Sequence, residues 1–321
     1  MIFYEHELLI KESRVALLKE CNLTERCCQA LGELLTNSCV KELDLSENDL
    51  QDSGVKLLSA GLASPTCQLE KLRLKFCGIT GIGCDFLATA LRSQPTHLQE
   101  LDLSYNYPGP TEPLSSLQND MGNLTIRVNG NAECYLKSAL KKYWCELTMD
   151  VTTAHSQLSF SEDNRTISRT DAAQPYPDNP ERFTDWGQVL CKEGLSGRCY
   201  WEVEWTGEWT GIGVAYKGIS RKAKGNECVL GYNDQSWSLR YCHGKYTAWY
   251  NKSDEATSVP YFSSKRAAVF LDCSAGTLSF YAVSPEAMTH LHTFHAEFQE
   301  PVYPGFRLGF PNSSLTLCQQ E

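Results

Sequence analysis

The first third of the chain repeats one pattern of leucines and polar residues. The segments "LDLSENDLQDSGVKLLSAGL" from Leu43, "LRLKFCGITGIGCDFLATAL" from Leu72 and "LDLSYNYPG" from Leu101 begin 29 residues apart, and a weaker copy begins at Ala16. In each full copy, Leu-x-Leu predicts a short strand, and the apolar positions that follow at helical spacing predict a helix. A period of this length, built from one strand and one helix, indicates a stacked α/β repeat.

One polar position follows each predicted strand of the repeat. Asn48 and Asn106 occupy it in two copies, and Cys77 and Cys21 occupy it in the others. An asparagine there can bond the exposed backbone of the stacked turns, and a cysteine can fill the same small buried space. This Leu-x-Leu-x-x-Asn/Cys pattern resembles the leucine-rich repeat, and the repeat length resembles the ribonuclease-inhibitor subclass. The resemblance implies an α/β solenoid over residues 1–133.

The two ends of the repeat differ in how they are capped. The pattern breaks at 107–113 ("YPGPTEP"), and 124–130 supplies one last strand, which finishes the C-terminal end. No polar cap precedes the first copy, although stacked repeats need caps at their ends. We therefore expect a repeat domain that is truncated on its N-terminal side.

Strand patterns replace helical ones after a connector at 134–146. In "LSGRCYWEVEW" (195–205), Cys199, Trp201, Val203 and Trp205 alternate with Tyr200, Glu202 and Glu204, which predicts a half-buried strand. The segments "QLSFSEDNRTISR" and "AVFLDCSAGTLSFY" each predict a hairpin. Many short strands without intervening helices predict an all-β antiparallel sandwich over 147–321.

Several ordered motifs of this second part are similar to a known family. The segment "LTMDVTTAHSQLSFSEDNRTI" (147–167) resembles PRY, and "VLCKEGLSGRCYWEVEW", "WSLRY", "VFLDCSAGTLSFYAV" and "EPVYPGFRLG" resemble successive SPRY motifs. Leucine-rich repeats followed by PRY-SPRY resemble the C-terminal part of the NACHT-domain (NLR-type) immune receptors expanded in fishes. That resemblance implies a cytoplasmic innate-immunity sensor whose upstream nucleotide-binding domain drives assembly.

Charge and cysteine usage narrow the classes of partner and compartment. The net charge of −10 is shared by both parts of the chain, which disfavours nucleic acid and anionic membrane as partners. No apolar run approaches the ~18 residues of a membrane span. Fifteen cysteines without a Cys-x-x-Cys pair indicate reduced thiols and a cytoplasmic protein. Against this stand five glycosylation sequons, at Asn22, Asn123, Asn164, Asn251 and Asn312.

Catalytic and metal-binding motifs have little support. The chain contains no Walker loop, no Gly-x-Ser-x-Gly elbow and no His-Glu-x-x-His pair. His290, His292 and His295 lie close together, but in a strand His290 and His292 share one face and His295 falls on the other. We expect no catalytic residue, no metal, no cofactor and no enzyme activity.

A partner is expected to meet one shallow face and the loops beside it. In "SWSLRYC", Trp237, Leu239 and Tyr241 share the predicted inward face, and Arg240 and Cys242 lie on the other. The resemblance to PRY-SPRY domains implies five partner-binding candidates: Trp209, Thr210, Arg240, Cys242 and Phe310. Ligand-binding relatives place tryptophans at the positions of Arg240 and Cys242, so an aromatic anchor is missing there.

A second candidate surface is the concave strand face of the repeats, and the alternative is a structural role for the repeats as a spacer and lid. Its outward residues are mixed in sign and favour no charge class of partner: Asp44, Ser46, Arg73, Lys75, Asp102 and Ser104. The sequence as a whole predicts a non-enzymatic protein-recognition module, the ligand-sensing or autoinhibitory C-terminal region of an NLR-type receptor. The alternatives are a free-standing adaptor or decoy, or a secreted toxin subunit that carries PRY-SPRY.

Overall fold

The computed structural model describes residues 12–93, 96–106, 112–128, 136–137, 140–222, 225–261, 263–285 and 288–320. The chain divides into two compact units, Met1–Ala139 and Leu140–Glu321. The segment before the first repeat, most of the break at 107–113 and part of the connector at 134–146 lie outside the described residues.

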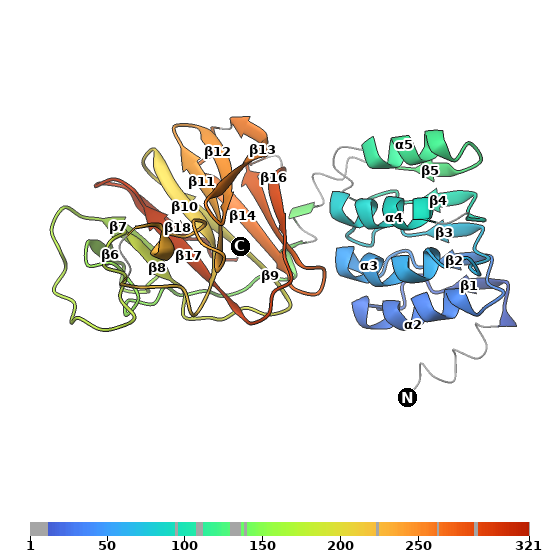
Figure 1. The fold of residues 1–321 in the computed structure, drawn as a ribbon, viewed down its shortest axis with the longest axis horizontal. Coiled ribbons are helices and arrows are strands. Elements are labelled where there is room, and N and C mark those ends of the chain that lie inside the picture. The colour runs from blue at the N-terminus through green and yellow to red at the C-terminus, as the bar shows by residue number, and fades with distance from the viewer. Residues whose placement is uncertain are drawn as a thin grey trace. The chain divides into compact units, whose positions relative to one another are not determined.

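The first unit alternates short parallel strands with helices (Figure 1). The strands are β1 (Val15–Leu17), β2 (Glu42–Asp44), β3 (Lys71–Arg73), β4 (Glu100–Asp102) and β5 (Thr125–Arg127), and they form one sheet in that order. The helices are α2 (Glu25–Thr36), α3 (Gln51–Leu62), α4 (Gly81–Ser93) and α5 (Glu112–Asp120). Leu43, Leu72 and Leu101 lie in register and are fully buried, because each strand turns one leucine toward the helices.

Asparagines tie the successive turns of this unit together, as the sequence predicts. The side-chain oxygen of Asn48 accepts hydrogen bonds from the backbone nitrogens of Cys21 (3.0 Å) and Leu23 (2.9 Å) in the preceding turn. Its nitrogen donates to the carbonyl of Leu18 in that turn and to that of Leu45 in its own turn. Asn106 repeats the arrangement two periods on. The Cys77 thiol fills the equivalent space and donates to a backbone carbonyl. Each polar side chain here is therefore a structural link between stacked turns.

The second unit is an antiparallel sandwich of two sheets (Figure 1). The first sheet has six strands in the order β13-β12-β11-β10-β17-β8, and the second has seven in the order β16-β15-β14-β9-β18-β7-β6. The strands of the first sheet are β8 (Gln188–Leu190), β10 (Trp209–Tyr216), β11 (Ser236–Cys242), β12 (Lys245–Tyr250), β13 (Ser253–Tyr261) and β17 (Val302–Leu308). Those of the second are β6 (Leu158–Phe160), β7 (Thr166–Arg169), β9 (Arg198–Trp205), β14 (Arg266–Asp272), β15 (Thr277–Val283), β16 (Met288–His295) and β18 (Ser314–Leu317). Both predicted hairpins, β6–β7 and β14–β15, are confirmed.

Strand β9 departs from the half-buried strand that its alternation predicts. Trp201, Val203 and Trp205 enter the core as expected, but Tyr200 and Glu202 are also buried. The connector covers the second face, because Trp144 packs on the Tyr200 ring at 5.8 Å between centroids. The alternation thus identified the core face correctly, and of the residues predicted on the other face only Glu204 is exposed.

Candidate partner-binding site

Two arginines and a glycine form one row across the six-stranded sheet. The register pairs Gly211 of β10 with Arg240 of β11 on one side and with Arg307 of β17 on the other. The next residues along these strands are buried in the core: Ile212, Leu239 and Phe306. Because strand side chains alternate between faces, both arginines lie on the outer face of the sheet with the glycine between them.

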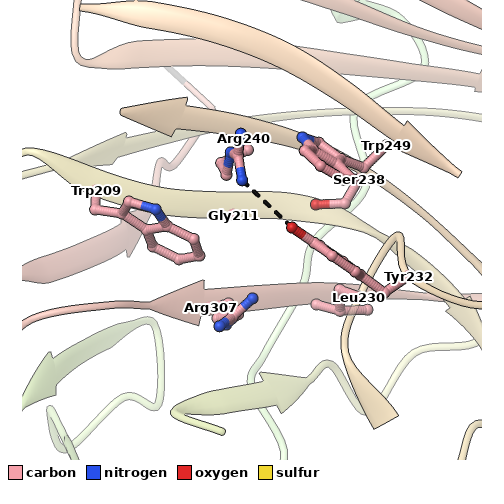
Figure 2. A pocket seen from close by; sticks show the side chains of 8 residues that line it. All are labelled: Trp209, Gly211, Leu230, Tyr232, Ser238, Arg240, Trp249 and Arg307. Carbon is pink, nitrogen blue, oxygen red and sulfur yellow. Dashed lines mark hydrogen bonds between the residues drawn. The ribbon is translucent and has the colours of Figure 1, made fainter. Parts of the chain in front are cut away.

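This row forms the floor of a shallow pocket on the outer face (Figure 2). We call it the arginine pocket, and eight residues line it: Trp209, Gly211, Leu230, Tyr232, Ser238, Arg240, Trp249 and Arg307. They come from strands β10, β11, β12 and β17 and from the loop before β11. The site therefore depends on sheet register as much as on any one segment.

Aromatic rings hold both guanidinium groups in place. The Arg240 guanidinium lies 4.5 Å from the Trp249 ring centroid and donates a hydrogen bond to the Tyr232 hydroxyl at 3.3 Å. The Tyr232 and Trp249 rings are themselves stacked, with centroids 4.5 Å apart. The Arg307 guanidinium lies 4.7 Å from the Trp209 ring centroid and 4.2 Å from that of Trp186. Such cation–π contacts fix the direction of a guanidinium while leaving its N–H donors available.

The pocket carries positive charge without a matching carboxylate. Across the part of the chain that the structure describes, neither Arg240 nor Arg307 forms an ion pair. The Arg240 Nε atom is buried and has no hydrogen-bond partner. Burial lowers the pKa of Arg307 to about 10, and the positive charge of Arg240 acts in the same direction. With this pKa the Arg307 guanidinium stays charged at neutral pH, so the pocket is cationic in a chain of net charge −10.

Part of the outer face is closed by a second, smaller hydrophobic cluster. It joins strand residues to the loops beside them: Phe183, Leu190, Ala215, Ile219, Cys228 and Leu230, with Trp186 and Tyr303 packed against them. Leu230 belongs both to this cluster and to the lining of the arginine pocket. The pocket therefore lies at the rim of this covered region, where the face opens.

The five residues predicted to bind a partner lie in different surroundings. Trp209 and Arg240 line the arginine pocket. Cys242 pairs in register with Trp209 and is half-buried, and Phe310 is 55% exposed in the loop after β17. Thr210 is fully buried, and its hydroxyl donates to the Arg307 backbone carbonyl at 3.1 Å. Since Thr210 follows an outward residue it faces inward, and the structure corrects the expectation that it is exposed to a partner.

Of the eight residues that line the pocket, the sequence predicts only Trp209 and Arg240. Arg307 and Trp249 were not among the predicted residues, although alternation in "VYPGFRL" and "KYTAWY" places both opposite core residues. Tyr232 lies in an irregular loop, where no periodic signal exists. The expected lack of an aromatic anchor on β11 is offset by Trp209 and Trp249 from the neighbouring strands.

The three clustered histidines do not converge on a site. Within the described residues, no group of three or more His, Cys, Asp or Glu side chains is placed to hold a metal ion. His290 Nε2 lies 2.8 Å from the Thr293 hydroxyl, and His292 Nε2 lies 3.4 Å from a Glu255 carboxylate oxygen. Burial lowers the pKa of both His290 and His292 to about 4.

Charges on the strand face of the repeat unit are paired with one another. Glu42 Oε1 lies 2.7 Å from Lys71 Nζ, and Lys75 Nζ lies 3.1 Å from Asp102 Oδ2 on the next strand. A further pair joins Glu100 to Arg127. The face therefore presents a ladder of mutually neutralised charges, unlike the arginine pocket.

The fold and the pocket together define a β-sandwich binding domain that follows a parallel α/β repeat. The model of the SPRY-associated domain, PRY, matches residues 147–195, and the SPRY domain model matches residues 198–320. A leucine-rich repeat model matches residues 36–59 and 94–106. The chain therefore contains leucine-rich repeats and a PRY-SPRY domain, which is a protein-interaction domain.

Similar proteins match between about half and four fifths of this chain. Stonustoxin subunit beta of Synanceia horrida is 44% identical over 171 residues, which cover 53% of this chain and 24% of the toxin subunit. Tripartite motif-containing protein 16 of Mus musculus is 33% identical over 261 residues, 79% of this chain and 45% of that protein. The crystal structure of the TRIM65 PSpry domain is 29% identical, with a TM-score of 0.54, over 60% of this chain and 99% of that domain. The chain thus spans between a quarter and a half of the length of these curated relatives. No helix among the described residues is long and apolar enough to span a membrane.

Proposed function

We propose that this chain is a non-enzymatic recognition module that binds a partner protein through the arginine pocket and the adjoining loops. One observation carries the proposal: two arginines and two tryptophans converge where the outer face is open. Arginine and tryptophan are among the residue types that dominate the binding energy of protein interfaces. The eight lining residues include no His, Asp or Glu that would serve Ser238 as a general base.

Within that function, we assign the chain to the ligand-sensing or autoinhibitory C-terminal region of an NLR-type innate immune receptor. The support is the occurrence of leucine-rich repeats and a PRY-SPRY domain in one chain. Nucleotide chemistry would then belong to an upstream domain. Sequencing the full-length transcript tests this assignment. A reading frame that continues upstream into a Walker loop supports it, and translation that begins at Met1 favours the adaptor or decoy.

We propose a cytoplasmic location for this chain, as the assignment to an NLR-type receptor implies. The fourteen cysteines that the structure describes are all free thiols, which suits a reducing compartment. Four of the five sequon asparagines, Asn22, Asn164, Asn251 and Asn312, have φ between 47° and 61°. Asparagine is favoured in this left-handed region, so these positions have a conformational reason for their residue type.

The identity to stonustoxin subunit beta supports a second candidate, a PRY-SPRY-bearing toxin-like subunit that is secreted. Mass spectrometry of the chain expressed in fish cells separates the two candidates. Occupied sequons would indicate passage through the secretory pathway, and unmodified asparagines favour the cytoplasmic receptor.

Site-specific photo-crosslinking in cells tests recognition at the pocket. p-Benzoylphenylalanine replaces Phe310, which is 55% exposed beside the pocket, or Tyr261, which is 68% exposed on the edge strand β13. We expect a discrete protein adduct from position 310 that disappears with Arg240→Gln and does not form from position 261. Equal adducts from both positions, or none from position 310, would contradict the proposal.

A further inference from the structure

The arginine pocket has N–H donors and positive charge that no acidic group of the described residues balances. Its two guanidinium groups are positioned by aromatic rings, and the described carboxylates form no ion pair with either. Asp254 of β13 pairs in register with Trp249, but its side chain is exposed and makes no ion pair with Arg240. The buried Nε of Arg240 is an N–H donor without an acceptor. A buried donor left unpaired is costly, and a ligand that supplies the acceptor removes that cost.

Gly211 leaves a narrow slot between the two arginines (Figure 2). A Cβ atom at this position would lie 3.4 Å from Arg307 Cβ and 3.6 Å from Ser238 Oγ, which are ordinary contact distances. No close backbone approach therefore requires a glycine at this position. The cavity holds only about 10 Å³, roughly the space of one water. A ligand must lie across the slot and insert a small group.

We propose that the arginine pocket recognises an aspartate or glutamate side chain of the partner protein, whose carboxylate bridges Arg240 and Arg307 above Gly211. The inference rests on the proposed function and adds the chemical class of the contact. A carboxylate is flat and offers two acceptor oxygens, which match the parallel donors of a guanidinium. Trp209 and Trp249 stand on either side of the row and offer apolar contact to the residues that flank the acidic one.

Electrostatics of the whole chain make this contact selective. Burial of Arg307, reflected in its lowered pKa, makes the cation costly, and an incoming carboxylate offsets part of that cost. Elsewhere the net charge of −10 repels an acidic segment. An acidic partner is thus directed to this pocket and away from the rest of the surface.

The test starts from a library, because the partner is unidentified. Phage-displayed random dodecapeptides are selected on the full chain and counter-selected on Arg240→Gln. The best peptide is then measured by fluorescence anisotropy in three forms: as selected, with its acidic residue changed to the amide, and with that residue changed to phosphoserine. Inorganic phosphate is added as a competitor. The protein variants are Arg240→Gln, Arg240→Lys, Gly211→Ala and, as a charge-matched control in the same unit, Lys192→Gln at an exposed position.

We expect enrichment of Asp or Glu at one peptide position. Changing it to the amide, or Arg240 to Gln, should weaken binding about tenfold or more, as the loss of a charge-assisted hydrogen bond predicts. Arg240→Lys should recover only part of the affinity, because an ammonium cannot bind bidentately. Gly211→Ala should weaken binding by filling the slot, and Lys192→Gln should change it less than about twofold.

The possible failures are distinguishable. If neutral peptides are enriched and their binding is lost in Gly211→Ala, the proposed function stands and the carboxylate inference fails. If the phosphoserine peptide or phosphate binds better than the carboxylate, the pocket is a phosphate site and the inference is overturned. If no peptide is enriched on the wild-type chain, both the inference and peptide recognition at this pocket fail. Circular dichroism of each variant establishes that a lost affinity does not reflect unfolding.

Discussion

Gly213 of β10 is a position where one added methyl group should force two strands apart. An ideal Cβ there would lie 2.0 Å from the Trp237 carbonyl oxygen and 2.9 Å from the Ser238 Cα atom of the neighbouring strand. Both contacts are to backbone, so no side-chain rotation relieves them. Gly211, two residues earlier on the same strand and face, has no contact shorter than 3.4 Å. Comparing the two positions therefore distinguishes a glycine that has no room for a Cβ atom, Gly213, from one that has room, Gly211.

The cost of Gly213→Ala follows from these distances. Bringing the methyl carbon to a normal contact requires β10 and β11 to separate locally by ~1 Å, and overpacking of this kind costs about 1–3 kcal/mol. Weakening one ladder hydrogen bond adds about 1 kcal/mol. The lower entropy of the unfolded alanine chain returns about 0.4–1 kcal/mol. We expect a net loss of about 2 kcal/mol for Gly213→Ala, and a change within about 0.5 kcal/mol for Gly211→Ala.

Tryptophan fluorescence during denaturation in urea measures this difference for the second unit alone. All seven tryptophans of the chain lie at or beyond position 144, so the signal reports the sandwich and not the repeats. The free energy of unfolding is taken from the midpoint and slope of each transition. Equal free energies of unfolding for the two alanine variants would refute the reasoning.

Three further substitutions test other parts of the fold. Asn106→Ala leaves buried backbone groups of two stacked turns without hydrogen-bond partners, so it should lower the free energy of unfolding of the repeat unit by about 3 kcal/mol. Circular dichroism at 222 nm measures this change, and a loss below about 1 kcal/mol would show that the link is dispensable. Glu202→Gln removes the carboxylate that lies 2.7 Å from Arg266 Nε. It should lower the free energy of unfolding by about 2 kcal/mol, less than for a fully buried pair because the Arg266 side chain is 29% exposed, and tryptophan fluorescence measures the change. Adding Arg266→Met should restore part of the lost stability, and no recovery would argue against an uncompensated charge as the cause. His290 and His292 have a pKa near 4 in the folded state, below the unfolded value of about 6.5, so the native state binds fewer protons between these limits. The stability that the neutral histidines contribute should be fully present above about pH 6.5 and should be lost as the pH falls toward 4. His292→Gln should therefore reduce the difference between the urea midpoints at pH 7 and pH 5, and an unchanged difference would exclude this histidine as a cause.

Local periodicity was sufficient to predict much of both units. The 29-residue spacing of Leu43, Leu72 and Leu101 is also the spacing of their strands, because each repeat closes its turn with its own residues. Alternation around Trp237 and Arg240 predicted correctly which side chain faces the core, since it depends only on strand geometry. Strand β13 was missed, because its sequence "SDEATSVPY" belongs to an edge strand that pairs on one side only and carries no apolar alternation.

The features that escaped prediction depend on contacts between distant segments. Tyr200 and Glu202 are buried because the connector at Trp144 and the chain end near Cys318 lie against β9, about 55 and 116 residues away in sequence. The pairing of Arg240 with Arg307 across Gly211 escaped for the same reason. This pairing exists because the register of three strands places the two arginines on either side of the glycine.

The repeat strands and the arginine pocket differ in how their charges are balanced, and this contrast supports the proposed recognition site at the pocket. On the repeat strands, charged residues such as Glu42 and Lys71 face each other across neighbouring strands, so each charge stabilises its partner within the fold. In the sandwich, Arg240 and Arg307 are brought together without a carboxylate, although apolar residues would pack between the tryptophans at lower electrostatic cost. Proteins depart from locally favourable choices mainly at functional sites. The overall charge of −10 disfavours a broad basic surface, but it is compatible with one small cationic pocket.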